Sequence, residues 1–94
     1  MPRFITRVEL HDAAYDDYET LHFAMEAEGF ERTITSGDEV TYHLPTAEYY
    51  CETALTRHDV LAAAKRAAAK TQKKFGAVVT ESKWITWSGL DKVR

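Results

Sequence analysis

The chain has 94 residues, of which 45% are hydrophobic and 29% are charged, as is typical of one globular domain. No apolar run approaches the roughly 20 residues of a membrane span, and the single cysteine, Cys51, excludes a disulfide framework. We therefore expect one cytoplasmic domain over residues 1–94, without a signal peptide or a membrane partner.

The net charge of -3 hides an uneven distribution along the chain. Eight acidic residues and no Lys or Arg lie between Glu9 and Glu31, whereas nine basic residues and only three acidic ones lie between Arg57 and Arg94. An acidic half and a basic half can bind partners of opposite sign, or each other.

The first half of the chain predicts a strand followed by a helix. Apolar and polar residues alternate over residues 3–10, which indicates a strand. A helix is expected over residues 14–28, with Tyr18, Leu21 and Met25 on its buried stripe and His22 at its edge. Gly29 suits the left-handed position that ends such a helix.

The second half predicts a hairpin, a second helix and a last strand. Residues 30–36 and 40–44 read as strands joined by the turn "SGDE", while residues 46–53 form either a strand or a loop. A two-faced helix over residues 56–74 begins at Thr56, with Asp59 completing a capping box. A strand begins at residues 77–80, and residues 88–94 are expected to be a loose tail.

This order of elements predicts a ferredoxin-like βαββαβ sandwich of the α+β class. The simplest arrangement is a four-stranded antiparallel sheet with both helices on one face. One sheet face would then remain open, and in so short a chain an open face indicates a homodimer or a bound ligand.

His11 and Asp12 stand at the junction of the first strand and the first helix. The pair can act as an acid, a base or a metal site, because a carboxylate binds hard cations and a histidine exchanges protons near neutral pH. The alternative is that Asp12 is only a helix N-cap. The four histidines match no zinc-ligand spacing.

The second helix carries a basic face that can follow a phosphate backbone. Its members are Arg66, Lys70, Lys73 and Lys74. The alternative is an ordinary solvated helix face. Phe23 points away from the apolar stripe of the first helix and is expected to be exposed.

The chain resembles the GhoS-type antitoxins of type V toxin–antitoxin systems, which share the ferredoxin-like fold with small CRISPR-associated nucleases. The matching segments are "VELHD", "YDDYETLHFAM", "GFERTI" and "TRHDVLAAAKRAAAK", and the resemblance covers about residues 4–80. It implies a cytoplasmic endoribonuclease that cleaves the messenger RNA of a small membrane-active toxin.

The resemblance also implies residue roles. Asp12 occupies the position of a metal-binding aspartate, with magnesium as the possible cofactor, and Arg7 and Arg32 resemble a catalytic arginine in type and strand position. We assign His11, Asp12 and Arg32 to catalysis, and Arg7 with the basic face of the second helix to RNA binding. The alternative function is a non-catalytic protein-binding module, such as a phage- or mobile-element-encoded inhibitor or adaptor.

Overall fold

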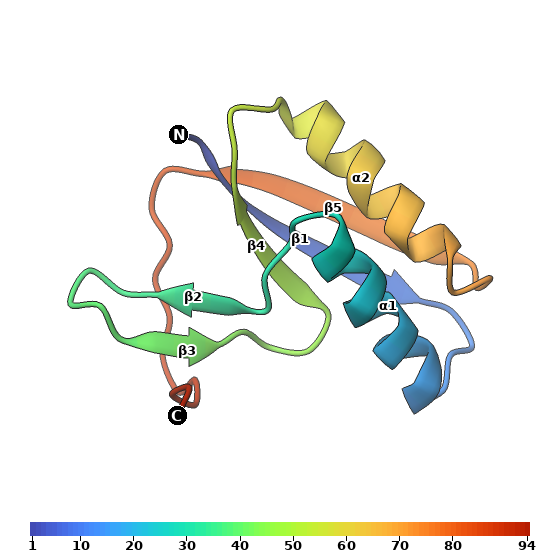
Figure 1. The fold of residues 1–94 in the computed structure, drawn as a ribbon, viewed down its shortest axis with the longest axis horizontal. Helices are drawn as coiled ribbons and strands as arrows, with labels where there is room; N and C mark the ends of the chain where they lie inside the picture. Colours follow the sequence, from blue (N-terminus) through green and yellow to red (C-terminus); the bar gives the residue numbers. More distant parts are fainter.

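The computed structural model describes residues 1–94 and contains two helices and five strands (Figure 1). Their order is β1 (Arg3–Leu10), α1 (Tyr15–Ala27), β2 (Thr33–Thr35), β3 (Thr41–His43), β4 (Glu48–Glu52), α2 (Arg57–Ala69) and β5 (Phe75–Ser82). The chain belongs to the α+β class, as the sequence predicts.

The first strand is the centre of the main sheet. β1 pairs antiparallel with β4 on one side and with β5 on the other. Its side chains alternate as predicted, so that Phe4, Thr6 and Val8 are fully buried while Arg7 and Glu9 are exposed. Because successive side chains of a strand point to opposite faces, β1 places one apolar row against the helices and one polar row on the other face.

Both helices cover the same face of this sheet, and they lie side by side (Figure 1). Leu21 and Met25 of α1 share a single core with Phe4 and Val8 of β1. The buried stripe of α2 is rich in alanine: Ala63, Ala64, Ala67 and Ala68. Because alanine side chains are short, α2 lies close to the sheet.

The sheet differs from the predicted four-stranded one. It has three strands, in the order β4-β1-β5, and β2 and β3 form a separate two-stranded hairpin. One bridge joins the parts, where Glu31 and Tyr50 exchange both backbone hydrogen bonds at 2.7 and 2.8 Å. Pro45 and the left-handed Ala47 (φ 69°) separate β3 from β4, so the hairpin departs from the sheet.

Other element boundaries were left undecided by the sequence or differ from their predicted positions. The undecided segment 46–53 contains β4. The predicted cap of the second helix is present, since the Thr56 hydroxyl accepts from the Asp59 N–H at 3.2 Å. However, α2 ends at Ala69 rather than near residue 74, and Gln72 then adopts a left-handed φ of 61°.

The last residues, expected to be a loose tail, contact the hairpin. The His43 N–H donates to the Asp91 carbonyl at 2.9 Å, and the Val93 N–H donates to the Thr41 carbonyl at 2.9 Å. The tail thereby lies beside β3 at the lower left of Figure 1. Neither helix has the length and apolar character needed to cross a membrane.

Candidate functional site

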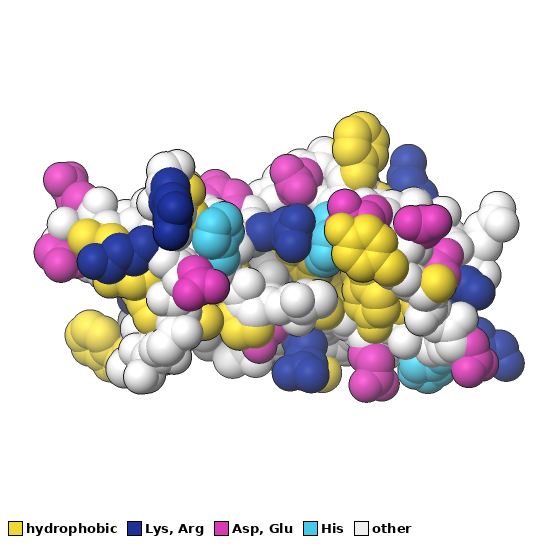
Figure 2. Space-filling model, turned by 90° about the horizontal axis from the view of Figure 1, so that it is seen from below, with side chains coloured by type: hydrophobic (Ala, Val, Ile, Leu, Met, Phe, Trp, Pro, Cys, Tyr) yellow, Lys and Arg dark blue, Asp and Glu magenta, His cyan; other side chains and the backbone are white.

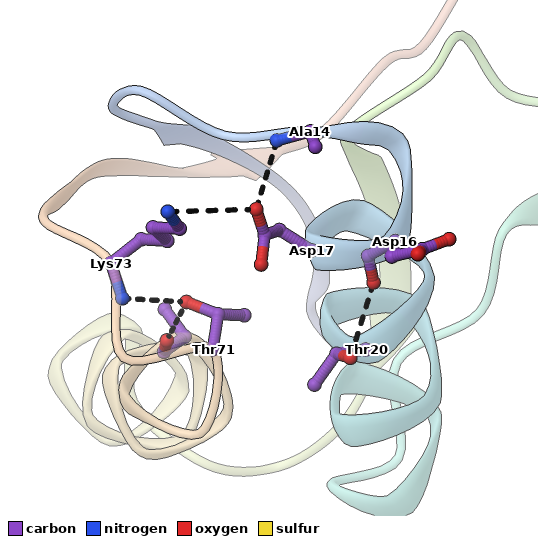
Figure 3. A network of polar contacts seen from close by, with 7 residues as sticks. Ala14, Asp16, Asp17, Thr20, Thr71 and Lys73 are labelled. Carbon is purple, nitrogen blue, oxygen red and sulfur yellow. Dashed lines mark hydrogen bonds and ion pairs between the residues drawn. The ribbon is translucent and has the colours of Figure 1, made fainter.

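Asp12 lies in an exposed turn after β1, with a left-handed φ of 51°. It does not cap α1, contrary to the prediction. The N-cap is Ala14, whose N–H donates to the Asp17 carboxylate at 2.8 Å (Figure 3). Asp12 lies two residues before the N-cap, too early in the chain to act as the cap itself. Its short polar side chain tolerates the left-handed conformation of the turn.

His11 does not form a pair with Asp12. Its backbone N–H donates to the Lys74 carbonyl at 2.8 Å, and its Nε2 lies 3.7 Å from Glu9 Oε1. The chain contains no group of three His, Cys, Asp or Glu side chains arranged to hold a metal ion. A single carboxylate is a poor ligand set for magnesium, so the residues of this turn within one chain do not fit that ion.

The predicted basic face of α2 is partly neutralised from within the chain. Arg66 donates two hydrogen bonds to the Glu28 carboxylate, at 3.0 and 3.3 Å. This contact lowers the pKa of Glu28 and raises the pKa of Arg66. The Lys73 amino group lies 3.8 Å from Asp17 Oδ2 (Figure 3). The acidic and basic halves therefore bind each other here.

The remaining predicted RNA-binding residues are not gathered into one surface. Lys70 and Lys74 are exposed and make no ion pair. Arg7 lies on the opposite face of the main sheet, where its guanidinium is 3.9 Å from the Glu48 carboxylate. Of the four basic residues predicted to share this face, only Lys70 and Lys74 make no ion pair, and both follow Ala69, the last residue of α2.

Arg32 lies far from the turn that holds His11 and Asp12. The Glu31–Tyr50 bridge places Arg32 beside Tyr49, which is paired with Thr6 in the middle of β1. From Thr6 to the end of β1 at Leu10 is roughly 13 Å at about 3.3 Å per residue, and Asp12 lies beyond. The structure therefore does not bring the three predicted catalytic residues together.

Arg32 instead shares an open hollow with His43, between the end of α1 and the β2–β3 hairpin. The hollow has a volume of about 730 Å³, and Glu26 and Glu31 also line it. Arg32 and His43 are both exposed, and Arg32 makes no ion pair with a carboxylate. Figure 2 shows histidine, basic and acidic side chains close to one another on the face seen from below.

A buried histidine–tyrosine pair lies next to Arg32. The Nδ1 atom of His22 is 2.6 Å from the Tyr49 hydroxyl, and the two residues are 5% and 0% exposed. Burial and then the charge of Arg32 lower the pKa of His22, opposed by Glu19 and Glu26. Burial raises the pKa of Tyr49.

Burial therefore favours the neutral form of both groups. In the tautomer with the His22 proton on Nε2, the Tyr49 phenol donates to Nδ1. Nε2 lies 4.0 Å from a Glu19 carboxylate oxygen, which suits this tautomer.

Only weak signals in the sequence point to this pair. His22 follows Leu21 and stands three positions before Met25, a spacing that allows it to share their buried face. Tyr49 lies in the segment whose structure was undecided, so its burial depended on assigning β4.

No family model matches the chain, and no curated protein matches it.

Proposed function

We propose that the chain is an antitoxin-like endoribonuclease that binds and cleaves a toxin messenger RNA at the hollow of Arg32 and His43. The observation that carries this proposal is an arginine without an ion pair and an exposed histidine on the wall of one open hollow, which Glu26 and Glu31 also line. Arginine clamps phosphate through its planar fork, and histidine moves protons near neutral pH. The resemblance to GhoS-type antitoxins supports the choice of RNA as substrate.

The residues present fit cleavage by the RNA's own 2′-hydroxyl. His43 accepts the 2′-hydroxyl proton, and the 2′-oxygen forms a bond to the adjacent phosphorus. The bond from phosphorus to the 5′-oxygen breaks, and the leaving oxygen takes a proton from solvent. Arg32 stabilises the charge that develops on the phosphoryl oxygens. The products are a 2′,3′-cyclic phosphate and a free 5′-hydroxyl.

The proposal is tested with labelled single-stranded RNA and purified variants. Arg32→Gln and His43→Gln should each slow cleavage by about 100-fold or more, as expected for loss of a charge-stabilising donor or an acid–base group. The matched controls Arg57→Gln and His58→Gln change exposed residues of the same types at the start of α2 and should leave cleavage unchanged.

Asp12 remains the competing catalytic candidate, and Asp12→Asn decides between the two places. Asparagine tolerates the left-handed φ of 51° as aspartate does, so the turn should be preserved. We expect full cleavage by this variant, with and without magnesium. Loss of cleavage in Asp12→Asn, with retention in Arg32→Gln, would move the reaction to the turn after β1 and overturn the assignment to Arg32.

We also place the fold in the ferredoxin-like class and infer a homodimer. The order β4-β1-β5, extended by the Glu31–Tyr50 bridge toward β2, supports the fold assignment. The open face of the main sheet carries Val78 at 63% exposure, and this apolar residue supports self-association. Light scattering should give twice the 10.7 kDa chain mass; the single-chain mass at micromolar concentration would exclude the dimer.

A non-catalytic protein-binding module is the second candidate. It is favoured by Phe23, which is 80% exposed on α1 as predicted, together with the self-neutralised basic face of α2. This function would be preferred if the wild-type chain neither bound nor cleaved RNA at low salt.

A further inference from the structure

A second cleft lies between the hairpin, the start of β1 and the segment that follows β5. Its volume is about 320 Å³. Arg3 and Tyr50 line it from the main sheet, Ile34 and Thr35 from β2, and Thr86 and Trp87 from the C-terminal segment. The cleft exists only because the C-terminal segment returns to the hairpin.

Arg3 is the charged residue among those that line this cleft. The guanidinium is half-buried and donates to the Lys83 carbonyl, and it makes no ion pair with a carboxylate. Arg7, four residues further along the same strand, is paired with Glu48. The cross-strand neighbour of Arg3, Glu52, makes no ion pair with it and does not line the cleft. A half-buried cation attracts an anionic group of a ligand more strongly than a solvated one does.

The walls of the cleft carry two oriented aromatic side chains. Trp87 packs edge-to-face against Tyr42, with ring centroids 5.6 Å apart, and this contact holds its ring in place. Tyr50 is half-buried and its hydroxyl donates to Glu52 at 3.1 Å. Aromatic rings in a positively charged groove are the platforms on which unpaired bases stack.

We propose that this cleft binds one unpaired nucleotide of the RNA, with its base against Trp87 and Tyr50 and its phosphate at Arg3. The inference rests on the proposed function for its choice of RNA. A cleft of about 320 Å³ is near the lower limit for a small-molecule site, so it accommodates one base and excludes a duplex.

The position of the cleft relates it to the hollow of Arg32. Ile34 and Thr35 of β2 line the cleft, Arg32 and Thr33 line the hollow, and Thr35 lies three positions after Arg32. At about 3.3 Å per residue this separation is roughly 10 Å of strand. A nucleotide held in the cleft would therefore anchor the RNA close to the phosphate at Arg32 and select unpaired segments for cleavage.

Trp87 itself reports binding. Trp84 is 81% exposed, so Trp84→Phe removes the other tryptophan without disturbing the interior. In this background a seven-residue oligouridylate should quench Trp87 fluorescence. Adding Arg3→Gln should weaken binding by about tenfold or more, the loss expected for a charge-assisted hydrogen bond. The matched control, Arg57→Gln, changes an exposed arginine that does not line the cleft and should change affinity by less than about twofold.

A second variant separates loss of binding from loosening of the C-terminal segment, since Arg3 also bonds the Lys83 carbonyl. Thr86→Glu adds a negative charge at the exposed rim of the cleft, and Ser88→Glu adds the same charge two residues outside it. Only the first should weaken binding of the oligouridylate. Equal effects of the two would overturn the cleft as a nucleotide site.

The outcome is read together with cleavage of a longer RNA by the same proteins. Cleavage without any Trp87 response would overturn the cleft and leave the proposed function standing. A Trp87 response that depends on Arg3, without cleavage, would support the cleft and refute the nuclease. Neither response would overturn both.

Discussion

Two regions of the molecule differ in whether their basic side chains pair with carboxylates of the same chain. One is the layer of helices, and the other is the hairpin with the C-terminal segment. In the first, Arg66 is bound to Glu28 and Lys73 lies against Asp17. At the second, Arg32, which precedes the hairpin, and Arg3 of β1, which lines the cleft beside it, make no ion pair with a carboxylate. The sequence indicates a nucleic-acid surface most clearly at the basic residues of the second helix. Some of these residues form ion pairs with carboxylates of the same chain.

The two regions also differ in how they are packed. The helices and the main sheet close around one core in which Phe4, Leu21 and Met25 are fully buried. The hairpin has strands of three residues each and is held by the bridge at Glu31 and by the returning C-terminal segment.

The largest expected effect distinguishes the stability of the two regions. Phe4→Ala should lower the free energy of unfolding by about 3–5 kcal/mol, because it empties a fully buried site in the core. Trp87→Ala should open the hairpin contact locally and leave the main transition nearly unchanged in urea denaturation followed by far-ultraviolet circular dichroism. Equal losses in the two variants would show that the regions unfold as one unit.

An intermediate effect is expected at His22, which bonds Tyr49 of β4 beside the core. Its pKa is lowered in the folded chain, so the unfolded chain binds a proton more readily as pH falls below the usual value of 6.5. Stability should therefore be full above that pH and decline as pH falls from 6.5 toward the lower folded pKa. His22→Gln should flatten this decline, measured as the urea midpoint at pH 7 and pH 5.

The control for His22 is His58→Gln, which changes an exposed histidine in the first turn of α2. The acid decline should persist in that variant. If the decline were equally steep in His22→Gln, carboxylates elsewhere would be its source.

The smallest effect is expected for the ion pair between the helices. Arg66→Glu places two acids together and should lower the thermal midpoint slightly, and adding Glu28→Arg should restore it, because exposed pairs contribute little. Oligouridylate affinity should change much less in Arg66→Gln than in Arg3→Gln. A larger loss in Arg66→Gln would return RNA binding to the helix face and break the contrast between the regions.

Local rules accounted for much of the fold. Alternation over residues 3–10 identified β1, and the Thr56–Asp59 box identified the start of α2. The separation of the hairpin from the main sheet was missed, because it depends on the left-handed Ala47 after Pro45. Asp12 illustrates the same limit, since the carboxylate that meets the first N–H groups of α1 belongs to Asp17.

The sequence by itself determined the class of the fold, the faces of the helices and the set of charged residues available for chemistry, because these follow from short-range periodicity and residue type. Only the tertiary structure decided which charges neutralise each other and which remain free. Arg66 and Glu28, which are in contact, lie 38 positions apart in the sequence. No short-range pattern reports such a contact, and the same is true of the hydrogen bond between His22 and Tyr49, whose formation needs both α1 and β4 in place.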